Sequence, residues 1–508
     1  MPDKRCVSGC KGLDVETCEK APRCSYANGE RRQFCRLART FKMNKRDCEV
    51  RRKTSKKQKA DVIHTFMKRT KSKRKAEFLK AVCDDSGVCI ALGTNRKKII
   101  DFFDGFANFE NVKPPIQAIG KPSSNGFVKS ITYEKNGYIS EAVLKSSVKT
   151  NADNLAYEYL VGLFLNEKCK QYPCFLETYG LFYYKTPEQW KHAMETKTIT
   201  TNVLKDSLEQ QHDELDFNRM CNSAKYGAIL IQHLSGVHSI GDLIFKSDRI
   251  VSVNFYITDL LPVLYQIYFP LSQMTTEFTH YDLHEDNVLL YEPAAGKYIQ
   301  YHYHHKDGTV VEFKSPYIVK IIDYGRSYFR SDKMDSFDVL KQLCKEPDCT
   351  DARGKCGASY GFRYMNTASD LRNASYICSA IYNPSHDLRL INILGKRFNE
   401  LNIKVKKNQA HVEIHSMLDY MFDNTIYGEG LTAAQKKEYY LYGTKAKPRS
   451  GISSSDTKIN NVNDAEVVVR DCINYYSPWN ETAHDQMDKL GDIHVYSDGT
   501  PMKFVPVA

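Results

Sequence analysis

The apolar positions in the middle of the chain fall into short runs that predict strands around one helix. Residues 139–145 form an apolar run that ends in a lysine, and residues 175–184 and 226–234 are two further runs of strand length. Residues 154–168 place apolar side chains at the spacing of a helix. Residues 185–225 are polar and contain no glycine, which predicts an inserted loop or a pair of helices.

The pattern then changes to longer apolar segments, each followed by polar residues. Residues 255–271 are largely apolar and lead into a polar stretch at 279–290. A second apolar strand begins at residue 317 and ends in Asp-Tyr-Gly at 323–325. Residues 390–440 have helical spacing. A β-rich part followed by a largely helical part is therefore expected, that is, the α+β class.

Three side chains in the polar stretches have the chemistry that phosphoryl transfer from a nucleotide requires. Asn287 follows Asp282 by five residues, and Asp323 follows the second apolar strand. A carboxylate such as Asp282 can orient or deprotonate an attacking hydroxyl group, and amide and carboxylate oxygens are suitable ligands for Mg²⁺. We therefore predict Asp282 as the catalytic base and Asn287 and Asp323 as metal ligands. The alternative is a solvated loop followed by a turn.

A small polar turn precedes the first strand. Gly120, Ser123, Ser124 and Gly126 belong to it, and the strand is entered at Val128. Backbone N–H groups of such a turn can hold phosphate oxygens, although a plain hairpin turn has the same composition.

Lys145 is the candidate cation for the phosphates. It ends an apolar strand, so its head can emerge beside a cleft while its stem packs in the sheet. A buried lysine needs a carboxylate partner to stay charged, and Glu158 on the following helix is the candidate. We expect Lys145 and Glu158 to lie within ion-pair distance. The rival groups are Lys129, Lys135, Lys149 and the carboxylate of Glu141.

These motifs resemble the serine/threonine protein kinases of nucleocytoplasmic large DNA viruses, over roughly residues 115–400. The resemblance implies a bilobal protein-kinase-like fold, with a small β-rich N-lobe at 101–234 and a larger helical C-lobe at 235–444. It also implies ATP and Mg²⁺ as cofactors and serine or threonine hydroxyls of a protein as acceptors. A viral kinase of this kind would act in the host cytoplasm or nucleus, or be carried in the virion.

The resemblance also assigns individual residues. It places Lys145 on the α and β phosphates, makes Asp282, Lys145 and His284 the catalytic set, and puts residues 232–234 where a kinase hinge contacts adenine. The ATP-binding set is Gly120, Ser123, Ser124, Gly126, Val128, Lys145, Glu158, Gln232, His233 and Leu234.

Several positions depart from the kinase pattern. Only Gly126 aligns with the three-glycine loop. Tyr281 replaces an arginine that serves control by a phosphorylated activation loop, and His284 replaces a lysine. The loop is also similar to that of small-molecule kinases such as aminoglycoside and choline phosphotransferases. A small-molecule phosphotransferase and a pseudokinase that serves as a scaffold or virion component are therefore the alternative functions.

Two further segments carry structural predictions. Residues 297–304 and 309–313 flank Asp-Gly and predict a β-hairpin, whose histidines, His302, His304 and His305, we expect to be exposed rather than bound to metal. Asp387 either braces the catalytic loop, as a helix carboxylate does in kinases, or faces solvent.

Charge is concentrated in one segment. The chain has 508 residues and a formal charge of +11, and residues 42–80 hold 16 Lys/Arg against 4 Asp/Glu. This part of the basic segment, 41–100, could bind nucleic acid or an anionic surface, act as a nuclear address, or be a solvated helix or linker. We expect no transmembrane helix, because no uninterrupted apolar run reaches 18 residues, and no secretory signal at the N-terminus.

The two ends of the chain are less informative. Residues 1–40 form a Cys-rich module in which zinc binding, a disulfide or unpaired thiols all fit the spacing, although an intracellular chain should keep its thiols reduced. Residues 445–508 comprise a linker rich in Lys, Ser and Gly and a C-terminal tail with no assigned role.

Overall fold

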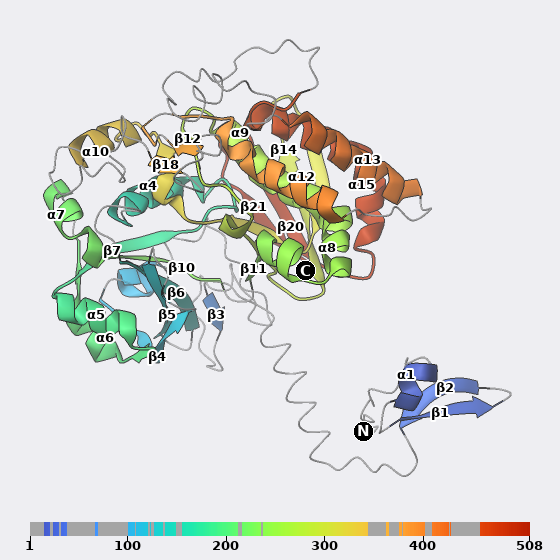
Figure 1. Ribbon diagram of the computed structural model, residues 1–508, viewed down its shortest axis with the longest axis horizontal. Coiled ribbons are helices and arrows are strands. Elements are labelled where there is room, and N and C mark those ends of the chain that lie inside the picture. Colours follow the sequence, from blue (N-terminus) through green and yellow to red (C-terminus); the bar gives the residue numbers. More distant parts are fainter. Residues whose placement is uncertain are drawn as a thin grey trace. The chain divides into compact units, whose positions relative to one another are not determined.

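The chain divides into two compact units, Met1–Val62 and Ile63–Ala508. The computed structural model is drawn in Figure 1. The described residues are 15–20, 24–29, 32–37, 67–69, 100–106, 108–119, 122, 126–135, 138–148, 155–211, 216–234, 237–343, 362–364, 375–377, 379–380, 382–401, 409–425, 427 and 458–507.

The first unit contains a short helix and a hairpin. Helix α1 (Val15–Lys20) precedes strands β1 (Cys24–Gly29) and β2 (Arg32–Leu37), which pair antiparallel. Cys18 is buried and disulfide-bonded. The expectation of reduced thiols is therefore wrong for Cys18, and the disulfide alternative applies to it. The remaining cysteines of the spacing argument lie outside the described residues or have undescribed side chains.

Besides Ile100 at its end, three residues of the basic segment are described. They form strand β3 (Met67–Arg69), which pairs antiparallel with the start of strand β6 (Tyr138–Ser147). The predicted binding of nucleic acid or an anionic surface by residues 42–80 otherwise lies outside the described residues.

The second unit has a mixed α/β fold whose largest element is an antiparallel sheet. Among the described residues this sheet has eight strands, in the order β8-β4-β5-β6-β10-β7-β9, with β3 on β6. Burial alternates along β5, so Phe127, Ile131 and Tyr133 enter the core from one face. The other bounds are β4 (Val112–Ile119), β5 (Gly126–Lys135), β7 (Thr178–Tyr184), β8 (Thr198–Ile199), β9 (Leu208–Gln210) and β10 (Gly227–Gln232).

Helix α4 (Leu155–Lys168) packs against β7 and β10. Gly162 makes the close approach feasible, because a Cβ atom there would lie 2.2 Å from the Thr178 hydroxyl oxygen. The inserted segment contains helices and two short strands where the sequence suggested a loop or a helix pair. Its helices are α5 (Pro187–Glu195), α6 (Thr201–Ser207) and α7 (Phe217–Asn222), followed by the 3-10 turn η4 (Ala224–Tyr226).

The core of the second half is one long helical stretch. Helix α8 (Arg249–Asn254), the π-helical turn η6 (Phe255–Asp259) and helix α9 (Leu260–Gln273) follow without a break. Residues 260–271 of α9 are all buried, as expected for a helix that is apolar on every face. Within the described residues, Arg249–Gln273 alone has the length and composition of a membrane span, and 67% of the apolar window is buried inside the fold.

Small antiparallel sheets bring the two polar stretches of the sequence close to each other in space. Strands β11 (Val237–Ser239), β13 (Val288–Tyr291) and β16 (Ile318–Ile321) form one of them. Val288 pairs with Ile321, which brings the end of the loop at 280–287 beside Asp323. The associated short elements are η5 (Asp242–Lys246), β12 (Phe278–Thr279), η7 (Glu285–Asn287), η8 (Tyr324–Arg326) and β17 (Tyr328–Phe329).

The predicted hairpin is confirmed as β14 (Lys297–His304) and β15 (Val310–Ser315). The C-terminal strand β20 (Asp488–Tyr496) pairs parallel with β14, and β21 (Lys503–Pro506) pairs with β20. The expectation of exposed histidines is wrong, because β20 side chains partly cover His302 and His304, and His305 hydrogen-bonds to Tyr265 of α9 at 2.8 Å. His302 hydrogen-bonds to Glu312 and Asp492, and its ring stacks on His494 at 4.5 Å.

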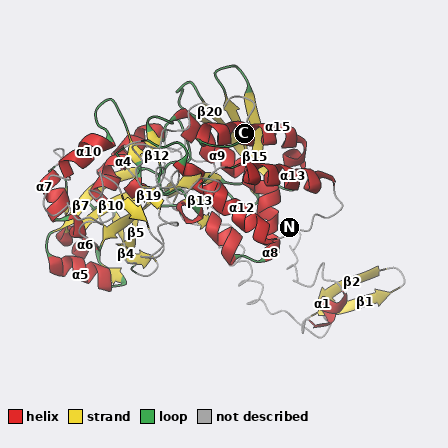
Figure 2. Cartoon of the chain, turned by 45° about the horizontal axis from the view of Figure 1, so that its top comes forward, coloured by secondary structure: helices red, strands yellow, loops and turns green. Residues whose placement is uncertain are grey.

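Helix α13 packs on both α12 and α15, and α15 packs on α9; Figure 2 shows the four helices gathered in one part of the unit. Residues 458–507, which carried no assigned role, therefore belong to this fold. The predicted helicity of residues 390–440 is confirmed in α12 and α13. The remaining bounds are η3 (Asp104–Phe106), α10 (Ser336–Leu343), β18 (Phe362–Tyr364), β19 (Ser375–Ile377), η11 (His386–Leu388), α12 (Arg389–Leu401), α13 (Gln409–Asn424) and α15 (Val462–Ala483).

Candidate active site

Lys145 lies between two carboxylates that come from distant parts of the chain. Its Nζ atom is 2.8 Å from Glu158 Oε2 on α4 and 2.8 Å from Asp323 Oδ1, which follows β16. The predicted ion pair with Glu158 is therefore present, and Asp323 joins it. Glu158 is almost completely buried, whereas 46% of the Asp323 side chain is exposed.

The three charges determine one another's protonation. Burial by itself would lower the pKa of Lys145, but the neighbouring charges of Asp323 and Glu158 outweigh burial and raise this pKa above its ordinary value. The positive charge of Lys145 in turn lowers the pKa of Asp323 to about 2. Lys145 and Asp323 are therefore both ionised at neutral pH, and the exposed side of the Asp323 carboxylate can receive a cation.

The strand register places other predicted residues on the same face of the sheet. Val128 lies opposite Lys145, and Gly126 is two residues before Val128. Gly126 also has a packing role, because a Cβ atom there would lie 2.5 Å from the Ser146 carbonyl oxygen. The predicted phosphate-binding residues Gly120, Ser123 and Ser124 lie outside the described residues.

The described rivals of Lys145 lie elsewhere. Lys129 is buried and donates to the Thr196 carbonyl oxygen, and Lys135 binds Asp104 at 2.7 Å. The rival carboxylate, Glu141, lies 3.9 Å from His233. Among the described candidates for the phosphate-binding cation, Lys145 is thus the lysine that pairs with Asp323. Lys149 lies outside the described residues.

The segment predicted to contact adenine uses two of its backbone donors within the protein. The N–H of Gln232 donates to the Glu177 carbonyl oxygen at 2.8 Å, and the N–H of His233 donates to the Glu141 carbonyl oxygen at 3.2 Å. Leu234 is buried. Any adenine contact has to come from other atoms of this segment.

His280 connects the predicted catalytic loop to the strand before Asp323. Its Nε2–H donates to the Ile322 carbonyl oxygen at 3.0 Å, and its Nδ1 atom accepts the N–H of Asp282 at 3.2 Å. Burial lowers the pKa of His280 to about 4, so the imidazole is neutral and keeps both bonds. Asn287 completes the loop, because its Nδ2–H donates to the Asp282 carbonyl oxygen at 2.9 Å.

The donor set at the end of this loop fits Mg²⁺. Asn287 uses its amide nitrogen on Asp282, which leaves the amide oxygen for a metal, and Asp323 supplies a partly exposed carboxylate beside it. Asp323 has a φ of 68°, a left-handed conformation that is costly for a residue other than glycine. Near Asn287, one ligand atom each of His284, Glu285 and Asp286 lies within 4.8 Å of the others.

Asp387 braces the loop at 280–287 and does not face solvent, so the first of the two alternatives given for it is confirmed. Its carboxylate oxygens accept the backbone N–H groups of His280 at 2.7 Å and Tyr281 at 2.9 Å. Burial raises the pKa of Asp387 to about 7, and the two N–H donors oppose this shift. Tyr281 is buried with a φ of 64°, and its ring lies 4.9 Å from that of His386.

Two arginines that sequence reasoning did not assign contact Asp282. Arg389 donates from Nη1 to Asp282 Oδ1 at 2.6 Å, and the Nη1 atom of Arg326 lies 3.3 Å from Oδ2. Arg326 directly follows the Asp-Tyr-Gly sequence, and Arg389 lies two residues after Asp387. Their proximity to these motifs was the available signal, but no spacing rule selects them.

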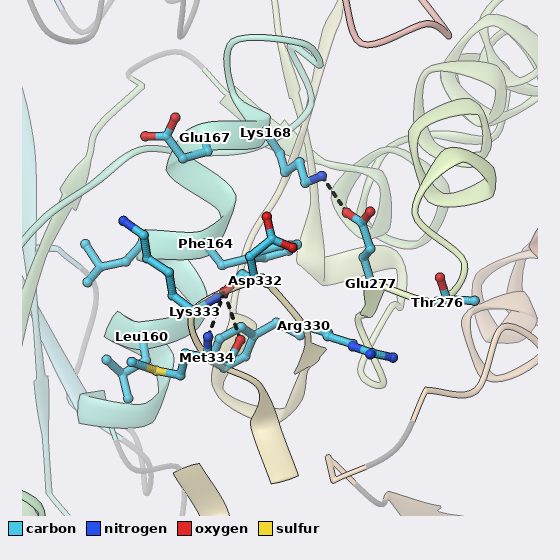
Figure 3. Close-up of a pocket in the computed structure, with 13 residues that line it drawn as sticks. Leu160, Phe164, Glu167, Lys168, Thr276, Glu277, Arg330, Asp332, Lys333 and Met334 are labelled. Carbon is cyan, nitrogen blue, oxygen red and sulfur yellow. Dashed lines mark hydrogen bonds and ion pairs between the residues drawn. The ribbon is translucent and has the colours of Figure 1, made fainter. Parts of the chain in front are cut away.

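A pocket of about 900 Å³ lies beside α4 and is lined by residues other than those above (Figure 3). Apolar side chains of α4 and β17 line it together with charged groups, among them the ion pair of Lys168 and Glu277 at 2.5 Å. None of the predicted catalytic, ATP-binding or metal residues lines this pocket.

The geometry therefore gathers Lys145, Glu158, Asp282, Asn287 and Asp323 from four separate stretches of the chain. Comparison with known proteins adds no identity to this arrangement, because no family model and no curated protein matches the chain.

Proposed function

We propose that this protein is an ATP- and Mg²⁺-dependent serine/threonine protein kinase with a bilobal, protein-kinase-like fold. The observation that carries the proposal is the position of Lys145, at 2.8 Å from both Glu158 and Asp323. These residues lie 13 and 178 positions from Lys145 in the sequence. A protein kinase needs this ion pair and this metal-binding aspartate in place together.

In the proposed reaction each residue has a distinct task. Lys145 would bind phosphate oxygens of ATP, and Asn287 and Asp323 would hold Mg²⁺, which supplies charge neutralisation on the phosphates when bound. Asp282 would orient the acceptor hydroxyl and receive its proton. The bond from the acceptor oxygen to the γ-phosphorus forms while the bond to the bridging oxygen breaks, and ADP leaves with that electron pair.

Two features leave the class of acceptor, protein or small molecule, less well supported than the phosphoryl-transfer chemistry. Tyr281 packs in the core rather than offering a cation at the loop surface, and His284 replaces the usual lysine. Both substitutions also fit a small-molecule phosphotransferase, which is the second candidate. A viral origin and packaging in a virion remain part of the proposal and rest on the sequence resemblance.

The test is transfer of labelled γ-phosphate by the purified full-length protein. Acceptors are the protein itself, a basic protein and small alcohols, each in the presence of Mg²⁺. We expect label on serine or threonine, loss of label in Asp282→Ala, and wild-type labelling in the control Asp488→Ala, an exposed aspartate on β20. Label on alcohols alone would select the small-molecule function, and absence of both transfer and ATP-dependent stabilisation would select the pseudokinase.

A further inference from the structure

Asp282 is held by two guanidinium groups, one on each carboxylate oxygen. Arg389 Nη1 donates to Oδ1 at 2.6 Å, and Arg326 Nη1 lies 3.3 Å from Oδ2. The Asp282 and Arg326 side chains are 12% and 11% exposed, so water does little to screen this group. A charge-assisted hydrogen bond of 2.6 Å fixes a side chain more firmly than a neutral one.

The same short segment holds both the backbone and the side chain of the loop. Asp387 accepts the N–H groups of His280 and Tyr281, and Arg389, two residues later, binds the Asp282 carboxylate. Arg389 is the first residue of α12, so the helix anchors the guanidinium. The loop and α12 therefore form one unit around Asp282.

The loop itself does not supply an equivalent fixed cation. His284, two residues after Asp282, accepts the backbone N–H of Asp286 on its Nδ1 atom at 3.3 Å. The Nδ1 atom is thus turned toward the loop backbone, whereas Arg326 and Arg389 are the cations that contact the Asp282 carboxylate among the described residues. The positive charges that contact the Asp282 carboxylate therefore belong to residues outside the loop.

We propose that Arg389 is a positioning residue that holds the Asp282 carboxylate in the orientation needed to receive the acceptor hydroxyl, and that it supplies the cation that position 284 does not. This inference rests on the proposed phosphotransferase function. A carboxylate has about four acceptor sites, so the hydrogen bond from Arg389 and the ion-pair contact with Arg326 leave acceptor sites for the hydroxyl. The proton of that hydroxyl passes to Asp282 as the acceptor oxygen bonds to the γ-phosphorus and ADP departs.

Arg389 suits an experimental test better than Arg326. Its side chain is 29% exposed, against 11% for Arg326, so removal leaves a space that small ions from solvent can reach. Arg397 offers a matched control on the same helix, because it donates to the Ile244 carbonyl oxygen and pairs with Glu400 rather than with the loop.

The experiment measures kcat, KM for ATP and melting temperature for the full-length wild type and for Arg389→Ala, Arg389→Lys and Arg397→Ala. We expect Arg389→Ala to lower kcat about 10²-fold, as misplacement of a reacting group does, with little change in KM for ATP. Arg389→Lys should retain an intermediate kcat, and Arg397→Ala should match the wild type in kcat.

Rescue by guanidinium ion separates positioning from folding. At concentrations far below those that unfold the protein, the ion should raise kcat of Arg389→Ala about tenfold and should not raise that of the wild type or Arg397→Ala, relative to the same concentration of sodium chloride. Wild-type kcat in Arg389→Ala, a loss proportional to unfolded protein, or absence of rescue would each overturn the inference. Absence of transfer by the wild type would overturn the proposed function as well, so the two failures are distinguishable.

Discussion

The two charged centres of this protein have opposite compositions. At Lys145 one cation lies between two carboxylates, Glu158 and Asp323, which gives a formal charge of −1. At Asp282 one carboxylate lies between two cations, Arg326 and Arg389, which gives a formal charge of +1. Each centre lacks one charge for neutrality, and the missing charges have opposite signs.

This difference indicates which ligand each centre can receive. A centre with net negative charge and a partly exposed carboxylate attracts a divalent cation, whereas a centre with net positive charge attracts the anionic groups of a nucleotide or of a deprotonating acceptor. Ordinary structural ion pairs have no need of such a division. Substitutions that change one centre and not the other test whether the division is functional.

The largest expected effect is on turnover. Asp282→Ala removes the only carboxylate of the positive centre and should lower kcat by about 10²- to 10⁴-fold, the usual contribution of a positioned acid–base group. The melting temperature should change little in comparison, and Asp488→Ala is the control. A variant that retains wild-type turnover would remove Asp282 from the mechanism.

The next effect is on stability, at the negative centre. Lys145→Met leaves Glu158 buried without its cation, and the free energy of unfolding should fall by about 3 kcal/mol. The loss is expected to be large because Glu158 is almost completely buried and would keep its charge without its cationic partner. Chemical denaturation of the apoprotein measures the effect.

A double variant identifies the cause. Adding Glu158→Gln to Lys145→Met removes the unpaired charge and should restore most of the lost stability. Lys135→Met is the matched control, since its partner Asp104 is 45% exposed and the expected loss is below about 1 kcal/mol. Equal losses in Lys145→Met and Lys135→Met would show that the negative centre has no special energetic role.

A third effect tests the metal. Mg²⁺–ATP at about 100 times its dissociation constant should stabilise the wild type by about 2.7 kcal/mol. Asn287→Ala and Asp323→Ala should each remove the Mg²⁺-dependent part of this shift, while the exposed Asn463→Ala should keep it. Thermal melting with ATP alone and with Mg²⁺–ATP separates the two parts. A full shift in both variants would place the metal elsewhere.

The local sequence pattern was sufficient to predict which residues of the candidate site carry its carboxylates, its amide and its lysine. Apolar segments followed by polar residues indicated Asp282, Asn287 and Asp323, and the strand and helix patterns indicated Lys145 and Glu158. Asp282 and Asp323 lie in loops that follow β12 and β16, and Asn287 ends η7, whereas Lys145 and Glu158 lie within β6 and α4. Whether they form a kinase-like bilobal fold is an interpretation that the sequence resemblance supplies.

Long-range pairings were beyond such rules. The parallel pairing of β14 with β20 joins residues about 190 positions apart, such as His302 and Asp492, and neither segment contains a signal for the other. Arg326 and Arg389 resemble any surface arginine until the fold brings them to Asp282. The sequence likewise could not show that the N–H groups of residues 232 and 233, predicted to contact adenine, donate instead to the carbonyl oxygens of Glu177 and Glu141.

A further predicted effect, on the pH dependence of stability, concerns His280, which connects the two centres. Its neutral ring donates to Ile322, next to Asp323, and accepts from Asp282, so protonation at Nδ1 would break the second bond. The pKa of His280 is lowered from 6.5 to about 4 by burial. Between these two values the unfolded chain binds a proton that the folded protein does not, so stability is complete above pH 6.5 and is lost as the pH falls toward 4.

The expected slope from this one residue is about 1.4 kcal/mol per pH unit in that window. Other buried groups titrate nearby: burial lowers the pKa of His386 and His484 to about 3 and about 4, and raises the pKa of Asp259 to about 6. The measurement is therefore a difference, the unfolding free energy of His280→Gln minus that of the wild type from pH 4 to 7. Exposed His238→Gln should leave the slope unchanged. A His280→Gln variant with the wild-type slope would mean that His280 binds protons equally in the folded and the unfolded protein, and the hydrogen bonds that connect the centres through a neutral ring would have to be assigned differently.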